Sequence, residues 1–230
     1  MDVLSVVVPR FHSEGVRFVA IFAAVTIVLF VIWQPLGWLG LIATVWCFYF
    51  FRDPDRITPI GRGLVIAPAD GVVCAVGPAT PPETLATIQE KMLRVSIFMS
   101  VFNCHVNRVP MTGSVVKSVY HPGKFLSATL DKASTDNERQ ILAIETDIGQ
   151  IIGVVQIAGL IARRIVCDVK EGDQVMSGER FGMIRFGSRV DVYLDAASVP
   201  LVAEGQIVIG GETVLADLVS TEPPRQFRLR

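Results

Sequence analysis

The sequence contains few of the side chains that bind metal ions or build disulfide frameworks. Among 230 residues there are three histidines and four cysteines, with no C-x-x-C and no H-E-x-x-H spacing. We therefore expect no metal site. The cysteines are scattered, which fits a reducing compartment better than a disulfide-rich secreted domain; they are Cys47, Cys74, Cys104 and Cys167.

An excess of charge of one sign is also missing. The chain has 21 Lys and Arg residues against 22 Asp and Glu residues. A protein that binds duplex nucleic acid usually carries a basic surface, so we expect no nucleic-acid partner.

Hydrophobic residues are abundant, and they are concentrated near the N-terminus. The mean hydropathy is +0.49, and two uncharged runs occupy residues 18–33 and 38–51, with Pro35 and Gly37 between them. Each run is shorter than the roughly 20 residues of a spanning helix, so we predict a helical hairpin that spans the bilayer with tilt or thinning, or enters one leaflet. Arginines flank both ends and predict the cytoplasmic face of the cell membrane; they are Arg10, Arg17, Arg52, Arg56 and Arg62.

The remainder of the chain is typical of a β-rich domain. Short stretches rich in valine and isoleucine alternate with glycines and prolines. This pattern predicts a mainly β fold, a compact sandwich or barrel. We therefore divide the chain into a membrane-associated hairpin with linker, residues 1–60, and a β-rich domain, residues 61–230.

An internal repeat refines this fold prediction. Residues 169–179 and 202–212 align without gaps as V-x-E-G-x-x-V-x-x-G-E, which indicates two copies of one turn-strand-turn unit. Such units resemble those of lipoyl and biotinyl domains, the barrel-sandwich hybrids. "ETD" at 145–147 is similar to the lipoyl hairpin, but Ile148 follows where a carrier domain needs its modified lysine. The likeness therefore supports the fold and argues against a swinging-arm carrier.

Gly187 and Ser188 interrupt what otherwise scans as one buried strand. Apolar residues fall two apart on either side of the pair, at Ile184 and Phe186 before it and at Val190, Val192 and Leu194 after it. A Gly-Ser pair in a strand is ordinarily a β-bulge. It also has a chemical use, because glycine lets the serine hydroxyl attack the preceding carbonyl, and β-elimination from the resulting ester cuts the chain and leaves a pyruvoyl group.

An ordered series of motifs resembles the phosphatidylserine decarboxylase family, specifically its short bacterial and archaeal branch. The series covers residues 15–218 and comprises "FFRDPDR", "APADGVV", "FNCHVNRVP", "GSVVKSVYHPGKF", "NERQ" and "RFGSRVDVYL". The resemblance implies a pyruvoyl-dependent carboxy-lyase that converts phosphatidylserine to phosphatidylethanolamine with release of CO₂.

The same resemblance assigns roles to residues. It implies self-cleavage between Gly187 and Ser188 into chains 1–187 and 188–230, which stay associated, and a covalent pyruvoyl cofactor formed from Ser188. Asp70 matches the acidic residue of the self-cleavage machinery, and His105 matches the histidine of the decarboxylation step.

The sequence departs from longer members at Arg108, where those carry a second histidine. The general base for cleavage therefore stays open between Asp70 alone, His105 and His121. Arg108 instead suits the lipid phosphate, because arginine offers paired donors. We expect a packing or capping role for His121.

Two other functions share some of these features. A membrane-anchored adaptor with a lipoyl-like domain would have the hairpin and the β fold without catalysis. A pyruvoyl decarboxylase of a soluble amino acid would have the reactive pair but no need of a membrane hairpin. The sequence is compatible with a homo-oligomer and does not specify one.

Overall fold

A computed structural model describes residues 10–86, 90–125, 136–160, 164–185, 187–220, 222 and 225–228. The chain forms two compact units. The helical unit comprises the described residues up to Asp55 together with Phe102–Cys104, and the β unit comprises Arg56–Val101 and the described residues from His105 onward.

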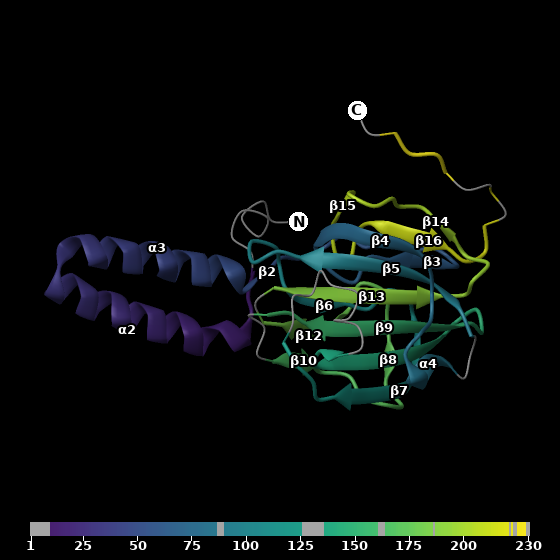
Figure 1. Cartoon of the computed structure of the whole chain (residues 1–230), viewed down its shortest axis with the longest axis horizontal. Helices are drawn as coiled ribbons and strands as arrows, with labels where there is room; N and C mark the ends of the chain where they lie inside the picture. The colour runs from purple at the N-terminus through teal and green to yellow at the C-terminus, as the bar shows by residue number, and fades with distance from the viewer. Residues whose placement is uncertain are drawn as a thin grey trace. The chain divides into compact units, whose positions relative to one another are not determined.

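Two antiparallel helices make up most of the helical unit (Figure 1). The 3-10 helix η1 (Ser13–Gly15) leads into α2 (Val16–Ile32), which is followed by α3 (Gln34–Phe50), and the short strands β1 (Arg10–Phe11) and β2 (Arg52–Asp53) pair at their base. The sequence predicts a break around Pro35 and Gly37, but the connection is the single extended residue Trp33. The predicted helical hairpin is confirmed, but its break lies two residues before Pro35, because proline is well tolerated in the first turn of a helix.

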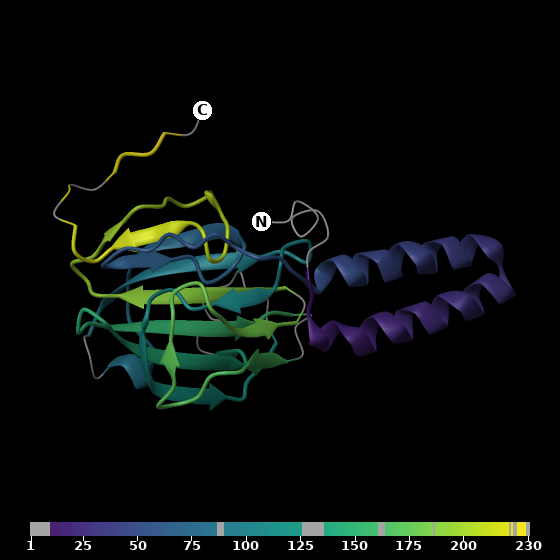
Figure 2. The same cartoon turned by 180° about the vertical axis from the view of Figure 1, so that it is seen from behind.

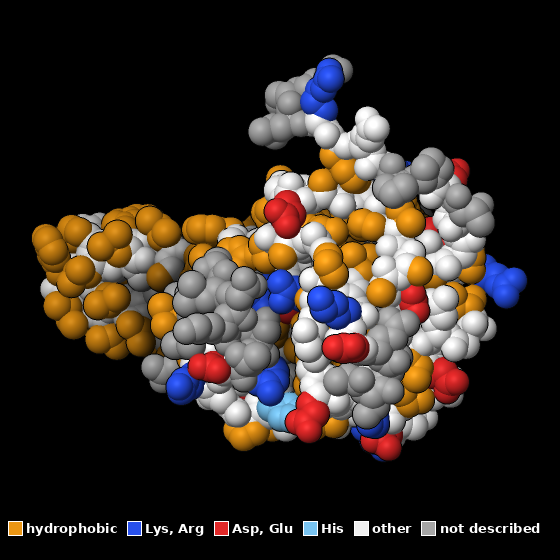
Figure 3. Space-filling view, turned by 45° about the vertical axis from the view of Figure 1, so that its right-hand side comes forward, with side chains coloured by type: hydrophobic (Ala, Val, Ile, Leu, Met, Phe, Trp, Pro, Cys, Tyr) orange, Lys and Arg blue, Asp and Glu red, His pale blue; other side chains and the backbone are white. Residues whose placement is uncertain are grey.

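Small and hydroxylated residues bring α2 and α3 together. A side chain at Gly37 would collide with the ring of Phe30. Thr26 and Thr44 share a hydrogen bond of 2.9 Å between their hydroxyls. Figure 3 shows hydrophobic side chains covering the surface of these helices. Among the described residues, one helical segment is long and apolar enough to cross a membrane. It is Ser13–Ile32, which consists of η1 and α2.

The β unit confirms the predicted mainly β fold. Its largest sheet is curled and has eight strands in the order β11-β7-β8-β9-β13-β5-β4-β15, and two three-stranded sheets have the orders β10-β12-β6 and β14-β16-β3. Figure 1 looks onto the eight-stranded sheet, and Figure 2 shows the unit from behind, with the C-terminal strands in yellow along one edge. The elements are β3 (Leu64–Ile66), β4 (Gly71–Ala79), α4 (Glu83–Ala86), β5 (Met92–Met99), β6 (Val106–Arg108), β7 (Gly113–His121), β8 (Arg139–Thr146), β9 (Ile151–Ala158), β10 (Ile165–Cys167), β11 (Gln174–Val175), β12 (Arg180–Ile184), β13 (Ser188–Leu194), β14 (Val199–Pro200), β15 (Ile207–Val208) and β16 (Val214–Asp217).

Alternating side chains give the large sheet two buried faces. The inner face forms the main core, to which β13 contributes Val190, Val192 and Leu194. The outer face carries a second apolar cluster that includes Tyr193 and Ile157. Residues of β13 are therefore buried on both sides, as in the central strand of a covered sheet.

The strand order is a palindrome of two structural repeats. Read from either edge, β11, β7, β8 and β9 correspond to β15, β4, β5 and β13. Both repeats contain a register shift at the same place, between Val73 and Ala75 in one and between Val115 and Lys117 in the other. The repeat seen in the sequence is therefore part of a pseudo-twofold symmetry of the whole sheet. The axis of this symmetry lies between β9 and β13.

The expected single strand through Gly187 and Ser188 is wrong. The chain leaves β12 at Ile184 in a three-stranded sheet and enters β13 at Ser188 in the eight-stranded sheet, and Phe186 lies outside the described residues. The period-2 pattern continues across the gap because each flanking strand has a buried face, so periodicity alone could not reveal the change of sheet.

Candidate active site

Gly187 occupies the entry to β13 with a left-handed backbone conformation. Its φ is +63°, a region that side-chain-bearing residues rarely adopt. The backbone N–H of Gly187 donates a hydrogen bond to Nε2 of His105 over 3.3 Å. The structure therefore brings together three of the residues that the sequence singles out: His105, Gly187 and Ser188.

Ser188 is completely buried at the start of the central strand. It pairs with Met99 on β5 and with Ala158 on β9. Its hydroxyl donates to the thioether sulfur of Met99 at 3.3 Å. A nucleophile held in this way is shielded from bulk water, which suits chemistry on the neighbouring peptide bond.

Two fully buried amides lie next to this contact. Asn107 on β6 approaches the Met99 sulfur through Nδ2 at 3.8 Å and accepts a hydrogen bond of 2.8 Å from Nε2 of Gln156 on β9. Among the described residues, Oε1 of Gln156 has no hydrogen-bond partner. The Ser188 hydroxyl thus stands at one end of a polar chain in an otherwise apolar core.

Asp70 belongs to a second cluster. Its Oδ2 accepts a charge-assisted hydrogen bond of 2.6 Å from Nη2 of Arg56, and its Oδ1 accepts one of 2.8 Å from the N–H of Gly210. Both charged side chains are largely buried, at 14% and 16% exposure. In the strand order β4-β5-β13, β5 separates the strand that follows Asp70 from the strand of Ser188.

Arg108 borders the same cluster. Its Nη1 donates to the carbonyl of Gly178 at 2.8 Å, and its side-chain stem lies against Gly211. The residue is 6% exposed. Its backbone N–H donates to the carbonyl of Pro68, which places the His105–Arg108 segment beside the loop that leads to Asp70.

His121 ends β7 at the same end of the sheet as Ser188. It pairs with Arg139, and Arg139 in turn pairs with Ile157, opposite Arg189. Two strands, β8 and β9, thus separate His121 from β13. Its Nε2 is buried and has no hydrogen-bond partner within the part of the chain that the structure describes.

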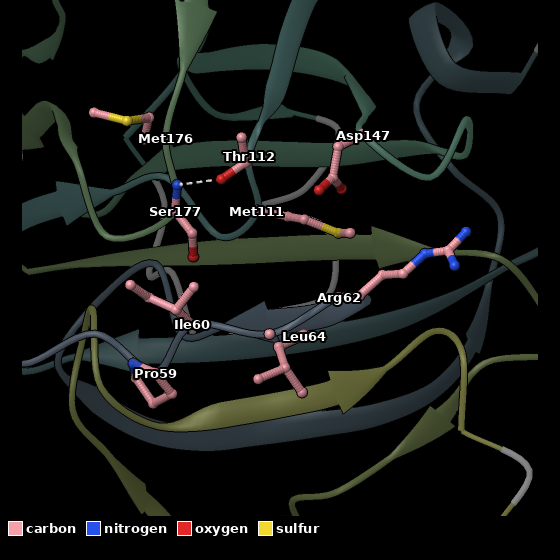
Figure 4. A pocket seen from close by; sticks show the side chains of 10 residues that line it. Pro59, Ile60, Arg62, Leu64, Met111, Thr112, Asp147, Met176 and Ser177 are labelled. Atoms are coloured by element: carbon pink, nitrogen blue, oxygen red, sulfur yellow. Dashed lines mark hydrogen bonds between the residues drawn. The ribbon is translucent and has the colours of Figure 1, made fainter.

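A cavity of about 590 Å³ opens elsewhere on the β unit (Figure 4). Its lining includes Arg62, Met111 and Asp147, and the N–H of Ser177 donates to Thr112 there. Asp147 follows the end of β8 that is remote from Ser188, so this cavity is not part of the candidate site. Within the described ranges no cluster of three or more His, Cys, Asp or Glu side chains is arranged for a metal ion.

Charged residues also lie on the outer face of β13. Arg189 and Asp191 form a buried ion pair there, with 2.8 Å between Nε and Oδ1. Burial, with a smaller contribution from the Asp191 carboxylate, raises the pKa of the neighbouring Tyr193 to about 12. Partial desolvation also raises the pKa of the Cys74 thiol on β4.

Sequence reasoning missed several of these contacts. Arg56 stands in the quoted "FFRDPDR" and Asn107 in "FNCHVNRVP", but nothing in either motif names its partner. Met99 reads as an ordinary apolar strand residue. Only the pairing of β5 with β13 identifies it as the neighbour of Ser188.

Comparison with known proteins identifies the family. Residues 43–216 match the family described as "Phosphatidylserine decarboxylase". The chain belongs to this family. It is accordingly a decarboxylase, a carboxy-lyase, and the adaptor without catalysis is set aside.

Relatives in the phosphatidylserine decarboxylase family match over most of the chain. The "Phosphatidylserine decarboxylase proenzyme" of Cereibacter sphaeroides is 62% identical over 230 residues, covering 100% of this chain and 99% of that protein. Proteins of the same name from Ruegeria pomeroyi and Beijerinckia indica are 58% and 57% identical, covering 90% and 94% of this chain and 94% and 93% of their own.

Proposed function

We propose that this chain cuts itself between Gly187 and Ser188 and then decarboxylates phosphatidylserine to phosphatidylethanolamine with a pyruvoyl group at residue 188. The observation that carries the proposal is the arrangement at the start of β13. A glycine with φ of +63° precedes a fully buried serine, and the glycine N–H is bound by His105. Family relatives named as proenzymes support a cleaved product.

The cleavage chemistry follows from the neighbouring atoms. Oγ of Ser188 attacks the carbonyl carbon of Gly187 and loses its proton, the C–N bond breaks, and the Ser188 nitrogen takes up a proton, which yields an ester. Removal of the Ser188 Cα proton then expels the Gly187 carboxylate together with Oγ. The dehydroalanine that remains gains water and loses ammonia, which leaves the pyruvoyl group at the N-terminus of the short chain.

His105 can serve these proton transfers. Its Nε2 accepts a hydrogen bond from the Gly187 N–H, which places this nitrogen beside the residue whose carbonyl is attacked. Asp70 is held by Arg56 and Gly210, across β5. We therefore assign His105 the direct proton transfer and Asp70 an electrostatic or water-orienting role in cleavage.

The surroundings of Ser188 fit a pyruvoyl group. The Ser188 side chain contacts the apolar Met99 sulfur, a suitable neighbour for a methyl group, and the buried Asn107 amide lies beyond. When formed, a pyruvoyl group supplies a carbonyl that condenses with an amine and accepts the electron pair left as CO₂ departs. His105 would then return a proton to the product carbon.

A lipid substrate explains the helical unit. Its apolar helices would hold the enzyme at the cytoplasmic face of the cell membrane, where phosphatidylserine is available without leaving the bilayer. Arg108 would meet the lipid phosphate, because a guanidinium offers paired donors that match the oxygens of a phosphate. The short chain would stay in place because β13 is hydrogen-bonded to β5 and β9 of the long chain.

Intact-mass spectrometry under denaturing conditions tests the cleavage. We expect two chains divided after Gly187, with the short chain lighter than a serine-started peptide by one ammonia, and a single uncut chain for Ser188→Ala. A folded but uncut wild-type chain would contradict the proposal.

Substrate comparison tests the lipid assignment. We expect the cut enzyme in detergent micelles to release CO₂ from phosphatidylserine and not from free serine. Faster release from free serine would replace the lipid by a soluble amino acid.

A further inference from the structure

The first residues of β13 contain a buried ion pair that no step above uses. Nε of Arg189 donates to Oδ1 of Asp191 at 2.8 Å, and Nη2 donates to Oδ2 at 3.0 Å. The side chains are 3% and 0% exposed. Two parallel bonds between a planar guanidinium and a carboxylate fix both side chains, because each restrains rotation of the other.

General stability is a poor explanation for this pair. Removing two charges from water costs free energy that their attraction often fails to recover, and apolar residues of similar volume commonly serve as well. Both residues lie on the outer face of the sheet, next to the apolar cluster that includes Ile157 and Tyr193. The pair lies between this apolar cluster and polar residues of β5, with Ser96 opposite Asp191 and Arg94 opposite Tyr193.

The second repeat shows what the same position looks like without a reactive bond. Phe98 pairs with Val72 on β4 and Glu145 pairs with Ser114 on β7, at matching places in the two repeats. β5 pairs with β13 and β8 pairs with β9, so the correspondence extends to β13 and β9. It aligns Gly187 with Gly149, and both residues have a positive φ, +63° and +81°.

The match then aligns Arg189 with Ile151 and Asp191 with Gly153. The repeat with an ordinary hairpin turn thus has an apolar residue and a glycine where the Ser188 repeat has the ion pair. The pair therefore accompanies the reactive serine and is not a requirement of the fold.

Cleavage would leave β13 with a free N-terminal end, which the corresponding strand β9 does not have. β13 is the first strand of the short chain, whereas its neighbours β5 and β9 both belong to the long chain. Once the bond to Gly187 is broken, residue 188 is a free strand end, and strand ends fray. A slip by one residue would turn it from the inner face to the outer face.

Resting on the function proposed above, we propose that the Arg189–Asp191 ion pair is a positioning device that holds residue 188 in register between β5 and β9 after the chain is cut. Asp191 lies two residues beyond Arg189, so the two hydrogen bonds between their side chains keep the backbone between them extended. The residue that precedes the pair then projects to the inner face, toward Met99.

Hydrogen exchange on the wild-type protein gives the first test and needs no substitution in the pair. The amides of residues 189 to 191 are measured in the cut wild-type enzyme and in uncut Ser188→Ala, both as full chains in detergent. We expect their protection to agree within about tenfold. Exchange in the cut enzyme at the rate of an unfolded chain would overturn the proposal, because the segment would not be held.

A volume-matched apolar variant gives the second test. Arg189→Met/Asp191→Leu should fold with a melting temperature within a few degrees of wild type and should cut itself. In the cut form kcat should fall about tenfold or more with KM within about twofold, because misplacement of a reacting group affects turnover more than lipid binding. Protection of residues 189 to 191 should fall in the cut variant and persist when Ser188→Ala is added.

Controls separate positioning from a general structural role. Tyr193→Phe alters the same face of the same strand two residues further on, and it should leave kcat unchanged. If the apolar variant does not fold, Arg189→Lys keeps the charge without the planar fork, and the same fall in kcat is expected. A kcat within about twofold of wild type in the variant that folds would overturn the proposal.

The two proposals fail in different ways. A wild-type chain that stays uncut, or is cut but releases no CO₂, would disprove the proposed function. A wild-type chain that is cut and active, with variants that match its kcat, would disprove only the role of the ion pair.

Discussion

The backbone N–H of Gly187 donates to Nε2 of His105, a residue from the loop before β6, which is remote in the sequence. The bond links the residue before Ser188 to a side chain that can move protons. Its geometry leads directly to the first prediction.

His105→Ala should lower CO₂ release from phosphatidylserine by about 10²- to 10⁴-fold, the usual range for loss of a general acid or base. The rate is measured on whatever fraction of the variant has been cut. His121→Ala is the control, since two strands separate it from β13, and it should retain activity within about twofold. An equal loss in both variants would show that our ranking of the two histidines is wrong.

Gly187→Ala should slow self-cleavage by a conformational effect. An added Cβ would meet only Val101, at 3.9 Å, so the cost comes from the φ of +63° and is about 1 to 2 kcal/mol. Gly149→Ala is a matched control with a φ of +81° and nothing within 4 Å. Thermal melting should show similar destabilisation in both variants, and time-resolved gel analysis should show slow cleavage only at Gly187. Slow cleavage in both would indicate a folding defect.

Arg56→Ala should slow self-cleavage if Asp70 takes part in it. Loss of the 2.6 Å contact leaves the Asp70 carboxylate held only by the Gly210 N–H, so its orientation loosens. Arg56→Lys should recover part of the rate, because the charge remains while the planar guanidinium does not. The exposed Arg62, changed to alanine, provides the comparison, and a rate for Arg56→Ala equal to that of this control would remove Asp70 from the machinery.

The raised pKa of Tyr193 predicts that the folded protein loses stability in alkaline solution. Its pKa is raised to about 12 in the folded chain from about 10 in the unfolded chain, mainly by burial. The stabilising contribution is therefore complete below pH 10 and is lost as the pH rises toward 12. The free energy of unfolding should fall by about 2 to 3 kcal/mol over this range.

Tyrosinate absorbance checks this assignment. The chain has three tyrosines. The absorbance step near pH 12 should be present in the wild type and absent in Tyr193→Phe. Persistence of that step in the variant would assign the shifted pKa to a different tyrosine.

Much of the fold could be predicted from particular residues. Valine and isoleucine between glycines indicated β structure, and the Gly172/Gly205 and Gly178/Gly211 pairs marked the repeat, because all four have positive φ. The break between the two helices was predicted near Pro35 but lies at Trp33. Proline is favoured in the first turn of a helix, so Pro35 lies inside α3 and does not end a helix.

The site was less accessible to sequence reasoning. His105 and Gly187 meet through a side chain and a backbone group, a contact that leaves no pattern in the sequence. The same holds for Arg56 with Asp70 and for Met99 with Ser188, since strand order, and not spacing along the chain, sets these distances. Arg189 and Asp191 lie inside a quoted motif, but two charges in a strand ordinarily indicate a solvated face.

The palindromic sheet also records how such a chain could arise. One repeat, β6 to β12, is continuous, whereas the other is interrupted between β5 and β13, where its counterpart has only the short turn between β8 and β9. This is the arrangement that duplication of an ancestral gene leaves when one copy is inserted into a hairpin turn of the other. The bond before Ser188 then lies at one of the two junctions between the copies, and the other junction lies between β5 and β6. The proposed cut at this bond would therefore interrupt no strand of either repeat.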